Sequence, residues 1–138
     1  MSEAENKEVV RRMAEEIFNK KNVDALGDFM ADEMVDHNAP PMDKPGLEGY
    51  KDLFRAYLAA FPDLNTSVDD VIAEGDKVVM RVTTSGTHQG NFMGIPATGK
   101  KVSFGEIHVV RIAGGKMVEH WGVEDQMGMM QQLGVIPS

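Results

Sequence analysis

This chain of 138 residues carries 22 acidic against 14 basic side chains, and its formal charge of −8 argues against nucleic acid or an anionic membrane as its main partner. The absence of cysteine excludes a disulfide scaffold and a thiolate metal site. The length suits one domain, residues 1–138, with a single core.

The first residues of the sequence, Met1–Glu5, are acidic and lack the apolar segment of a signal peptide. No apolar run approaches the length of a membrane span. We therefore expect a cytoplasmic protein that acts on a small, mostly uncharged molecule or binds another protein.

The N-terminal part of the chain is predicted to be helical. Ser2 and Glu5 have the spacing of a capping box, and the apolar residues that follow recur at helical spacing. This pattern predicts a helix over Glu3–Lys20. Asp24 is expected to cap a short second helix, which carries Leu26, Phe29 and Met30.

An extended segment and a longer helix are predicted next. Met34–Asn38 is expected to be extended and to stop before Pro40-Pro41, because proline cannot donate to a strand ladder. An apolar stripe predicts a helix over Leu47–Phe61, which Pro62 ends.

Beyond Pro62 the apolar residues alternate, which is typical of strands. Turns are expected at Gly75-Asp76 and Gly114-Gly115, and Gly134 is expected to close a last short helix. Helices followed by antiparallel strands predict an α+β fold with the helices on one sheet face. The predicted strands are Leu64–Ala73, Lys77–Thr87, Lys100–Ile112 and Met117–Val123.

Two titratable side chains lie among apolar ones on the third of these strands. Alternation puts Glu106 and His108 on one face, together with Val102, Phe104, Val110 and Ile112. Burying an unpaired charge is costly, so Glu106 and His108 must be paired, neutral or open to a cavity. Such groups in an apolar pocket often have pKa values suited to acid–base chemistry. The alternative is a purely structural His108 that pairs with Glu106.

What faces His108 depends on the register of the hairpin at Gly114-Gly115. A three-residue loop, Ala113–Gly115, would place His108 opposite His120 and Glu106 opposite Gly122. A two-residue loop would place His108 opposite Trp121 and turn His120 away. We prefer the first register, because only it gathers Glu106, His108 and His120.

Several other polar residues have structural alternatives. Asp125 is a candidate acid but also stands where the N-cap of the last helix is expected. His37 and Asn38 could add polarity to a pocket or make a turn before Pro40. The four histidines have no tight ligand spacing, so we expect no metal site.

The second half of the chain carries a series of spaced motifs. They are His88-x-Gly90-x-Phe92-x-Gly94-Ile95-Pro96-x-Thr98-Gly99-Lys100, Ile107-His108, Gly115-Lys116-x-Val118-Glu119-His120-Trp121, Asp125-Gln126-x-Gly128 and Gln131-Gln132-Leu133-Gly134. This pattern resembles the SnoaL-like polyketide cyclase family, also called ester cyclases. The resemblance covers nearly the whole chain and implies the nuclear-transport-factor-two-like, cystatin-like fold: a cone-shaped, curved antiparallel sheet with N-terminal helices packed on its concave face.

The resemblance implies cofactor-independent acid–base chemistry on a small apolar carbonyl compound. The same fold also hosts hydrolases, dehydratases, isomerases and non-catalytic binding or dimerisation modules, so these are the alternatives. Family members commonly pair through the outer sheet face, which implies a homodimer.

The resemblance also implies roles for particular residues. Characterised cyclases of the family use an aspartate on the last strand, shortly after the position of His120, where this chain has Gly122. Glu106 is expected to supply the missing carboxylate. His108, helped by Glu106, would move the proton, while His120 and Asn38 would hydrogen-bond the substrate's carbonyl oxygen.

The expected site therefore consists of two sets of residues and needs no cofactor or metal. The candidate catalytic residues are His108, Glu106, His120 and Asp125. The candidate substrate-binding residues are Phe18, His37, Asn38, Phe54, Phe92, Met93, Phe104 and Trp121.

Overall fold

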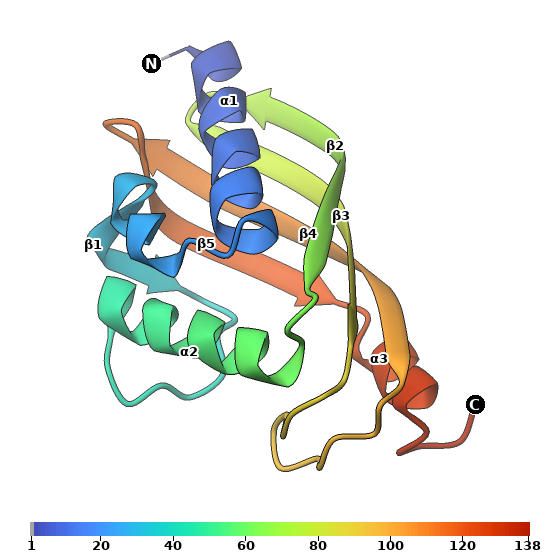
Figure 1. The fold of residues 1–138 in the computed structure, drawn as a ribbon. Helices are drawn as coiled ribbons and strands as arrows, with labels where there is room; N and C mark the ends of the chain where they lie inside the picture. The colour runs from blue at the N-terminus through green and yellow to red at the C-terminus, as the bar shows by residue number, and fades with distance from the viewer. Residues whose placement is uncertain (1) are drawn as a thin grey trace.

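The computed structural model describes residues 2–138, in which helices precede most of the strands (Figure 1). The first elements are α1 (Glu3–Met13), the π-helix η1 (Ala14–Asn19), the 3-10 helix η2 (Val23–Asp28), strand β1 (Met30–Asp36) and α2 (Gly46–Ala60). The remaining elements are β2 (Asn65–Glu74), β3 (Lys77–Thr87), β4 (Lys101–Ala113), β5 (Lys116–Glu124) and α3 (Gln126–Leu133).

The predicted start of the first helix and the predicted end of the last helix are confirmed. The Glu5 amide donates to Ser2 Oγ and the Ser2 amide donates to Glu5 Oε1, both over 3.1 Å, which is the capping box. The helical stretch that begins at Glu3 ends at Asn19, one residue short of the prediction. Gly134 has a φ of +77° and closes α3 in the left-handed conformation.

The prediction for the second helix is partly wrong. Its N-cap is Asn22, without a side-chain hydrogen bond, and the exposed Asp24 carboxylate instead accepts from Arg55 over 3.4 Å. Because this 3-10 helix ends at Asp28, the chain is already extended at Met30, and β1 begins there rather than at Met34.

The five strands form one sheet in the order β1-β5-β4-β3-β2. Strands β2 to β5 pair antiparallel as expected, whereas β1 pairs parallel with β5 at the edge, which makes the sheet mixed. The parallel pairing needs a long connection and places Asp36 opposite His120. The predicted α+β fold is confirmed, with this one strand added in the other direction.

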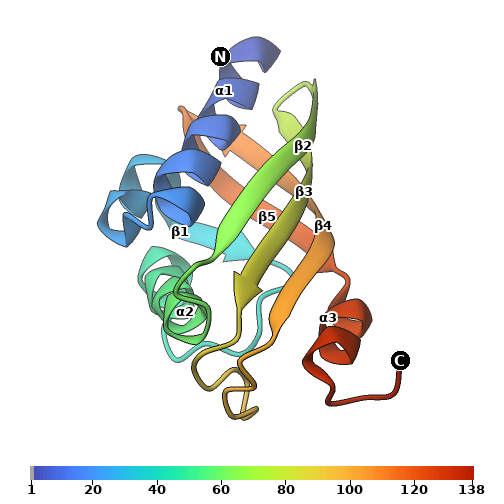
Figure 2. The same cartoon turned by 45° about the vertical axis from the view of Figure 1, so that its right-hand side comes forward.

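The helices α1, η1, η2 and α2 cover one face of the curved sheet, and α3 lies beyond the end of β5 (Figures 1 and 2). Helices and sheet meet in an apolar core, which accounts for most of the burial that stabilises the fold. Fully buried side chains from both layers meet there: Val10, Ile17, Leu26, Val78 and Val110.

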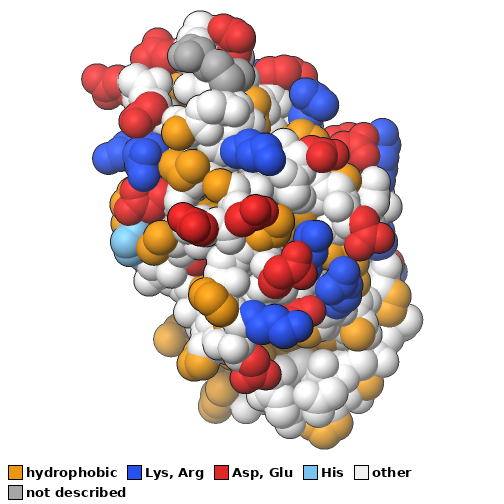
Figure 3. All heavy atoms as spheres, turned by 90° about the vertical axis from the view of Figure 1, so that its left-hand side faces the viewer, with side chains coloured by type: hydrophobic (Ala, Val, Ile, Leu, Met, Phe, Trp, Pro, Cys, Tyr) orange, Lys and Arg blue, Asp and Glu red, His pale blue; other side chains and the backbone are white. Residues whose placement is uncertain are grey.

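Acidic and basic side chains are interspersed on the face that Figure 3 shows, with hydrophobic side chains between them. Of the helices formed by residues 2–138, none has the length and apolar character needed to cross a membrane.

The β4–β5 hairpin sets the orientation of the titratable residues, and neither predicted register is right. Gly114 and Gly115 both have positive φ and form a two-residue turn, with Ala113 opposite Lys116. A β-bulge after this turn leaves Val118 as an extra residue on β5.

Beyond the bulge, each β4 residue pairs with a β5 residue one position later than a regular two-residue hairpin would give. His108 lies opposite Gly122, and His120 lies opposite Val110. The extra residue also restores the alternation between the strands, so Glu106, His108 and His120 still point to the helix-covered face.

Candidate active site

A cavity of about 410 Å³ lies between α2 and the inner face of the sheet. Such a volume is typical of a small-molecule site. The four titratable side chains that β4 and β5 contribute to its wall are Glu106, His108, His120 and Glu124. Most of the rest of the wall is apolar or aromatic and includes Phe18, Tyr50, Phe54, Tyr57, Phe92 and Phe104.

His108 is at the centre of the polar wall and uses both of its ring nitrogens. Nδ1 lies 2.8 Å from Nε2 of His120, and Nε2 lies 3.2 Å from Oε2 of Glu106. Gly122 allows this close approach, since a Cβ at that position would lie 2.7 Å from His108 Nδ1.

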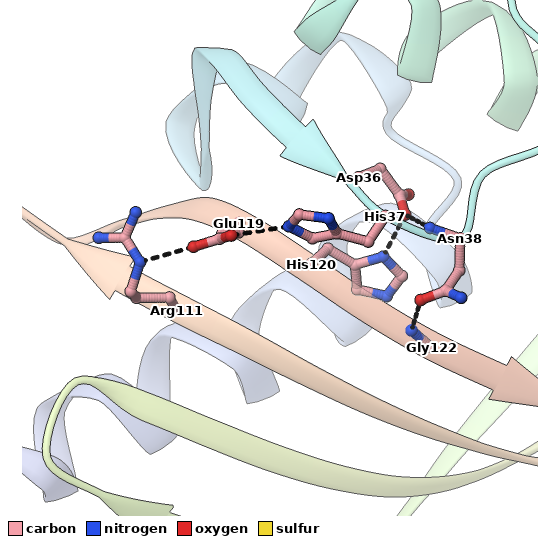
Figure 4. A network of polar contacts seen from close by, with 7 residues as sticks. All are labelled: Asp36, His37, Asn38, Arg111, Glu119, His120 and Gly122. Carbon is pink, nitrogen blue, oxygen red and sulfur yellow. Dashed lines mark hydrogen bonds and ion pairs between the residues drawn. The ribbon is translucent and has the colours of Figure 1, made fainter.

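Asp36 extends this arrangement on the other side of His120. Its Oδ1 lies 3.0 Å from His120 Nδ1, in a bent contact, and accepts from the Asn38 amide over 2.9 Å (Figure 4). Burial raises the pKa of Asp36, but the close contact with the His120 imidazole and the hydrogen bond from the Asn38 amide outweigh burial and hold that pKa below its usual value. We refer to Asp36, His120, His108 and Glu106 as the histidine network.

Glu106 ends the histidine network beside a second carboxyl group. Burial raises the pKa of Glu106, but the hydrogen bond and charge of His108 outweigh it, so the pKa lies below its usual value. Glu106 Oε2 also accepts from Thr84 Oγ1 over 3.1 Å. Glu124 lies opposite Glu106 across the ladder, and burial and the hydrogen bond with Glu106 raise its pKa.

Six of the expected substrate-binding residues are in place on the cavity wall: Phe18, Asn38, Phe54, Phe92, Met93 and Phe104. Asn38 is oriented by its side-chain oxygen, which accepts from the Gly122 amide over 2.9 Å (Figure 4). This contact leaves the Nδ2 group of Asn38 available as a donor to a ligand.

The structure places His37 and Trp121 outside the cavity, contrary to expectation. Their rings stack on each other with centroids 4.8 Å apart, and His37 Nε2 lies 2.7 Å from Glu119 Oε2. Glu119 in turn accepts from Arg111 over 2.9 Å (Figure 4). Because the even positions of β5 face the cavity after the bulge, Trp121 points to the outer face.

Asp125 also lies away from the histidine network. Its carboxylate accepts from the Gly128 amide over 2.9 Å and caps α3, so the position matches the structural alternative. Within residues 2–138, no group of three or more His, Asp or Glu side chains is arranged to hold a metal ion.

Four titratable residues of the cavity wall were not among the predicted site residues. Asp36 joins the site only through the parallel β1–β5 pairing, and Glu124 only through the bulge. Tyr50 and Tyr57 lie on α2 and face the cavity, where burial raises the pKa of both phenols. Glu124 could have been predicted from the sequence, because it lies four residues after His120 on the same strand and therefore points to the same face.

The stability of the fold is expected to fall in acid because of Asp36. Since its folded pKa lies below the unfolded value near 3.8, its contribution is present above that pH and is lost as the pH falls through the folded pKa. Asp36→Asn should therefore remove about 1 kcal/mol at neutral pH and flatten the acid slope. Urea unfolding at several pH values measures this, with the exposed Asp32→Asn on the same strand as control. Equal slopes for wild type and Asp36→Asn would contradict the assignment.

The comparisons with known proteins agree with this geometry. The SnoaL-like polyketide cyclase family matches residues 8–133. The aklanonic acid methyl ester cyclase DauD of Streptomyces sp. (strain C5) is 32% identical over 92% of this chain and 80% of DauD. The aklanonic acid methyl ester cyclase DnrD of Streptomyces peucetius is also 32% identical, over 92% of this chain and 89% of DnrD.

Solved structures show the same likeness over the whole length. TsrD from Streptomyces laurentii superposes with a TM-score of 0.90 at 30% identity and covers 99% of both chains. IdmH from Streptomyces antibioticus superposes with a TM-score of 0.81 at 30% identity, over 94% of this chain and 98% of IdmH. The chain belongs to the SnoaL-like polyketide cyclase family.

Proposed function

We propose that this protein closes a ring in a small, apolar carbonyl compound by acid–base chemistry that needs no cofactor. The observation that carries the proposal is the histidine network on the wall of an otherwise mostly apolar cavity. Paired titratable groups in such a site can accept and return a proton at neutral pH.

The proposed reaction consists of two proton transfers and one carbon–carbon bond. A proton leaves the carbon next to a carbonyl, and the resulting enolate carbon attacks a second carbonyl of the same molecule. The oxygen of that second carbonyl becomes an alkoxide and takes up a proton, so the product has the atoms of the substrate. Glu106, to which His108 is bonded, would handle the proton, and Asn38 Nδ2 would hydrogen-bond a carbonyl oxygen.

The charges around the cavity favour a neutral substrate. Asp36 and Glu106, whose pKa values lie below their usual values, are on its wall, so a free carboxylate would be repelled, whereas a methyl ester of the same compound would not. The curated relatives are named for cyclisation of a methyl ester. We therefore propose a polyketide-type methyl ester as the substrate class.

A second candidate is a binding module without turnover, and Gly122 is the observation that favours it. The family resemblance implies an aspartate there, and this chain has no side chain at that position.

Either function fits a homodimer through the outer sheet face, where Val35 is 52% and Ile107 is 46% exposed. Sedimentation equilibrium would measure the oligomeric state.

The test is a ring-closure assay with aklanonic acid methyl ester and the corresponding free acid. We expect wild type to form a product of unchanged mass and to prefer the ester, and His37→Ala, on the outer face, to behave like wild type. Loss of ring closure in His108→Gln would link turnover to the histidine network. Saturable binding of the ester without any product would instead show the binding module.

A further inference from the structure

Glu124 is a cavity-lining carboxyl group outside the histidine network. It is the last residue of β5, lies opposite Glu106, and is hydrogen-bonded to it. Its Oε1 accepts from Gln126 Nε2 over 3.0 Å, which orients the carboxyl group from the start of α3. Two carboxyl groups in contact cannot both ionise at low cost, so this pair holds one proton.

The contacts along the histidine network show which atoms can meet a ligand. The network has three close contacts, Asp36–His120, His120–His108 and His108–Glu106, of 3.0, 2.8 and 3.2 Å. All four ring nitrogens are therefore occupied by neighbours, so neither ring has a nitrogen left for a substrate.

The carboxyl groups of Glu106 and Glu124 therefore make the polar contact with a ligand on this wall. The groups that face them from the neighbouring elements are Thr84 of β3, Gln126 of α3, and Tyr50 and Tyr57 of α2, together with the imidazole of His108 on β4. The nearest further carboxylate, Asp36, lies beyond both imidazoles. His108 holds the pKa of Glu106 below its usual value, whereas burial and the neighbouring Glu106 raise the pKa of Glu124, so a proton shared by the two carboxyl groups favours Glu124.

We propose that Glu106 and Glu124 are the catalytic acid–base pair, with Glu106 taking the proton from carbon and Glu124 delivering its proton to the new alkoxide. His108 and His120 are then positioning residues that hold Glu106 in its ionised form. After ring closure the proton on Glu106 passes to Glu124 across their hydrogen bond, which restores the starting state. The pair ends each cycle with one proton, and no other reactant is needed. This division of roles rests on the proposed ring closure.

The test is Glu124→Gln, which keeps the size of the side chain and a donor toward Glu106 but has no proton to release. We expect kcat to fall about 100-fold with KM little changed. In wild type the activity should fall at high pH as Glu124 loses its proton, and this fall should be absent from the pH–rate profile of Glu124→Gln. Glu119→Gln, on the outer face of the same strand, is the matched control and should behave like wild type. A merely structural Glu124 would leave the shape of the pH profile unchanged.

A second measurement does not depend on turnover. Infrared spectroscopy of the wild-type protein at neutral pH should show a protonated carboxyl band that is lost in both Glu124→Gln and Glu106→Gln, because each removes the shared proton. Absence of this band in wild type, or wild-type turnover by Glu124→Gln, would overturn the inference. If Glu124→Gln keeps full activity while His108→Gln loses it, the ring closure stands and only the role of Glu124 fails.

Discussion

Gly122→Ala is expected to abolish most of the activity and to lower the stability by about 1–3 kcal/mol. The added Cβ would lie 2.7 Å from His108 Nδ1 and 3.0 Å from His120 Cε1, so the two imidazoles must separate. Once they separate, His108 loses the partner that fixes it against Glu106, and the histidine network is broken. Activity assays and urea unfolding of the same samples measure both effects.

Gly105→Ala is the matched control for this substitution. Gly105 lies on the neighbouring strand with its missing side chain directed outward, and a Cβ there meets no atom within 4 Å. We expect it to leave both activity and stability close to wild type. If Gly122→Ala were as active as Gly105→Ala, the contact between the imidazoles would have no role in turnover.

His108→Ala is expected to lower kcat/KM by about 10²- to 10⁴-fold at neutral pH. His108 is the group whose hydrogen bond and charge hold the pKa of Glu106 below its usual value. Without it, burial opposes the ionised form more strongly, and the pKa of Glu106 rises. The remaining activity should therefore need a higher pH than that of wild type.

The pH profile of kcat/KM measures this shift, and His37→Ala is the control. The His37 side chain stacks on Trp121 at the outer face, and the contact of His37 with His120 is a backbone hydrogen bond that His37→Ala keeps. The role given to His108 would be contradicted by an unchanged profile in His108→Ala. It would also be contradicted by an equal loss in both variants with folding intact.

Much of the fold could be predicted from the sequence because its signals are local. The capping box at Ser2, the apolar stripe of α2 and the glycine that closes α3 each depend on residues within a few positions of one another. The alternation of β4 also predicts that Glu106 and His108 share one face of the strand, and in the structure this is the face toward the cavity.

The rest of the site depends on contacts between distant segments, which local patterns do not specify. The partner of His120 is Asp36, brought to it by the parallel pairing of β1 with β5. The pairing of His108 with Gly122 depends on a bulge at Val118, which no residue pattern around the turn indicates. Expected pocket residues such as Trp121 fall on the outer face because of the same shift.

The role of Gly122 also depends on the three-dimensional arrangement. In the sequence it is a missing aspartate, which favours a protein without turnover. In the structure it is the space in which His108 and His120 meet, so the polar groups form one network without a side chain at that position. Gly122→Asp would therefore disrupt this network rather than restore a catalytic group.

Exchange of carbon-bound hydrogen tests the proton-transfer step in isolation. A simple keto ester that cannot cyclise, with one ketone as its activating group, exchanges slowly with solvent. In deuterated buffer we expect the wild-type protein to speed deuterium incorporation next to the ketone, and Glu106→Gln to lose this effect while still binding the ester. Binding of the ester by wild type with exchange no faster than in buffer would contradict acid–base chemistry in this cavity.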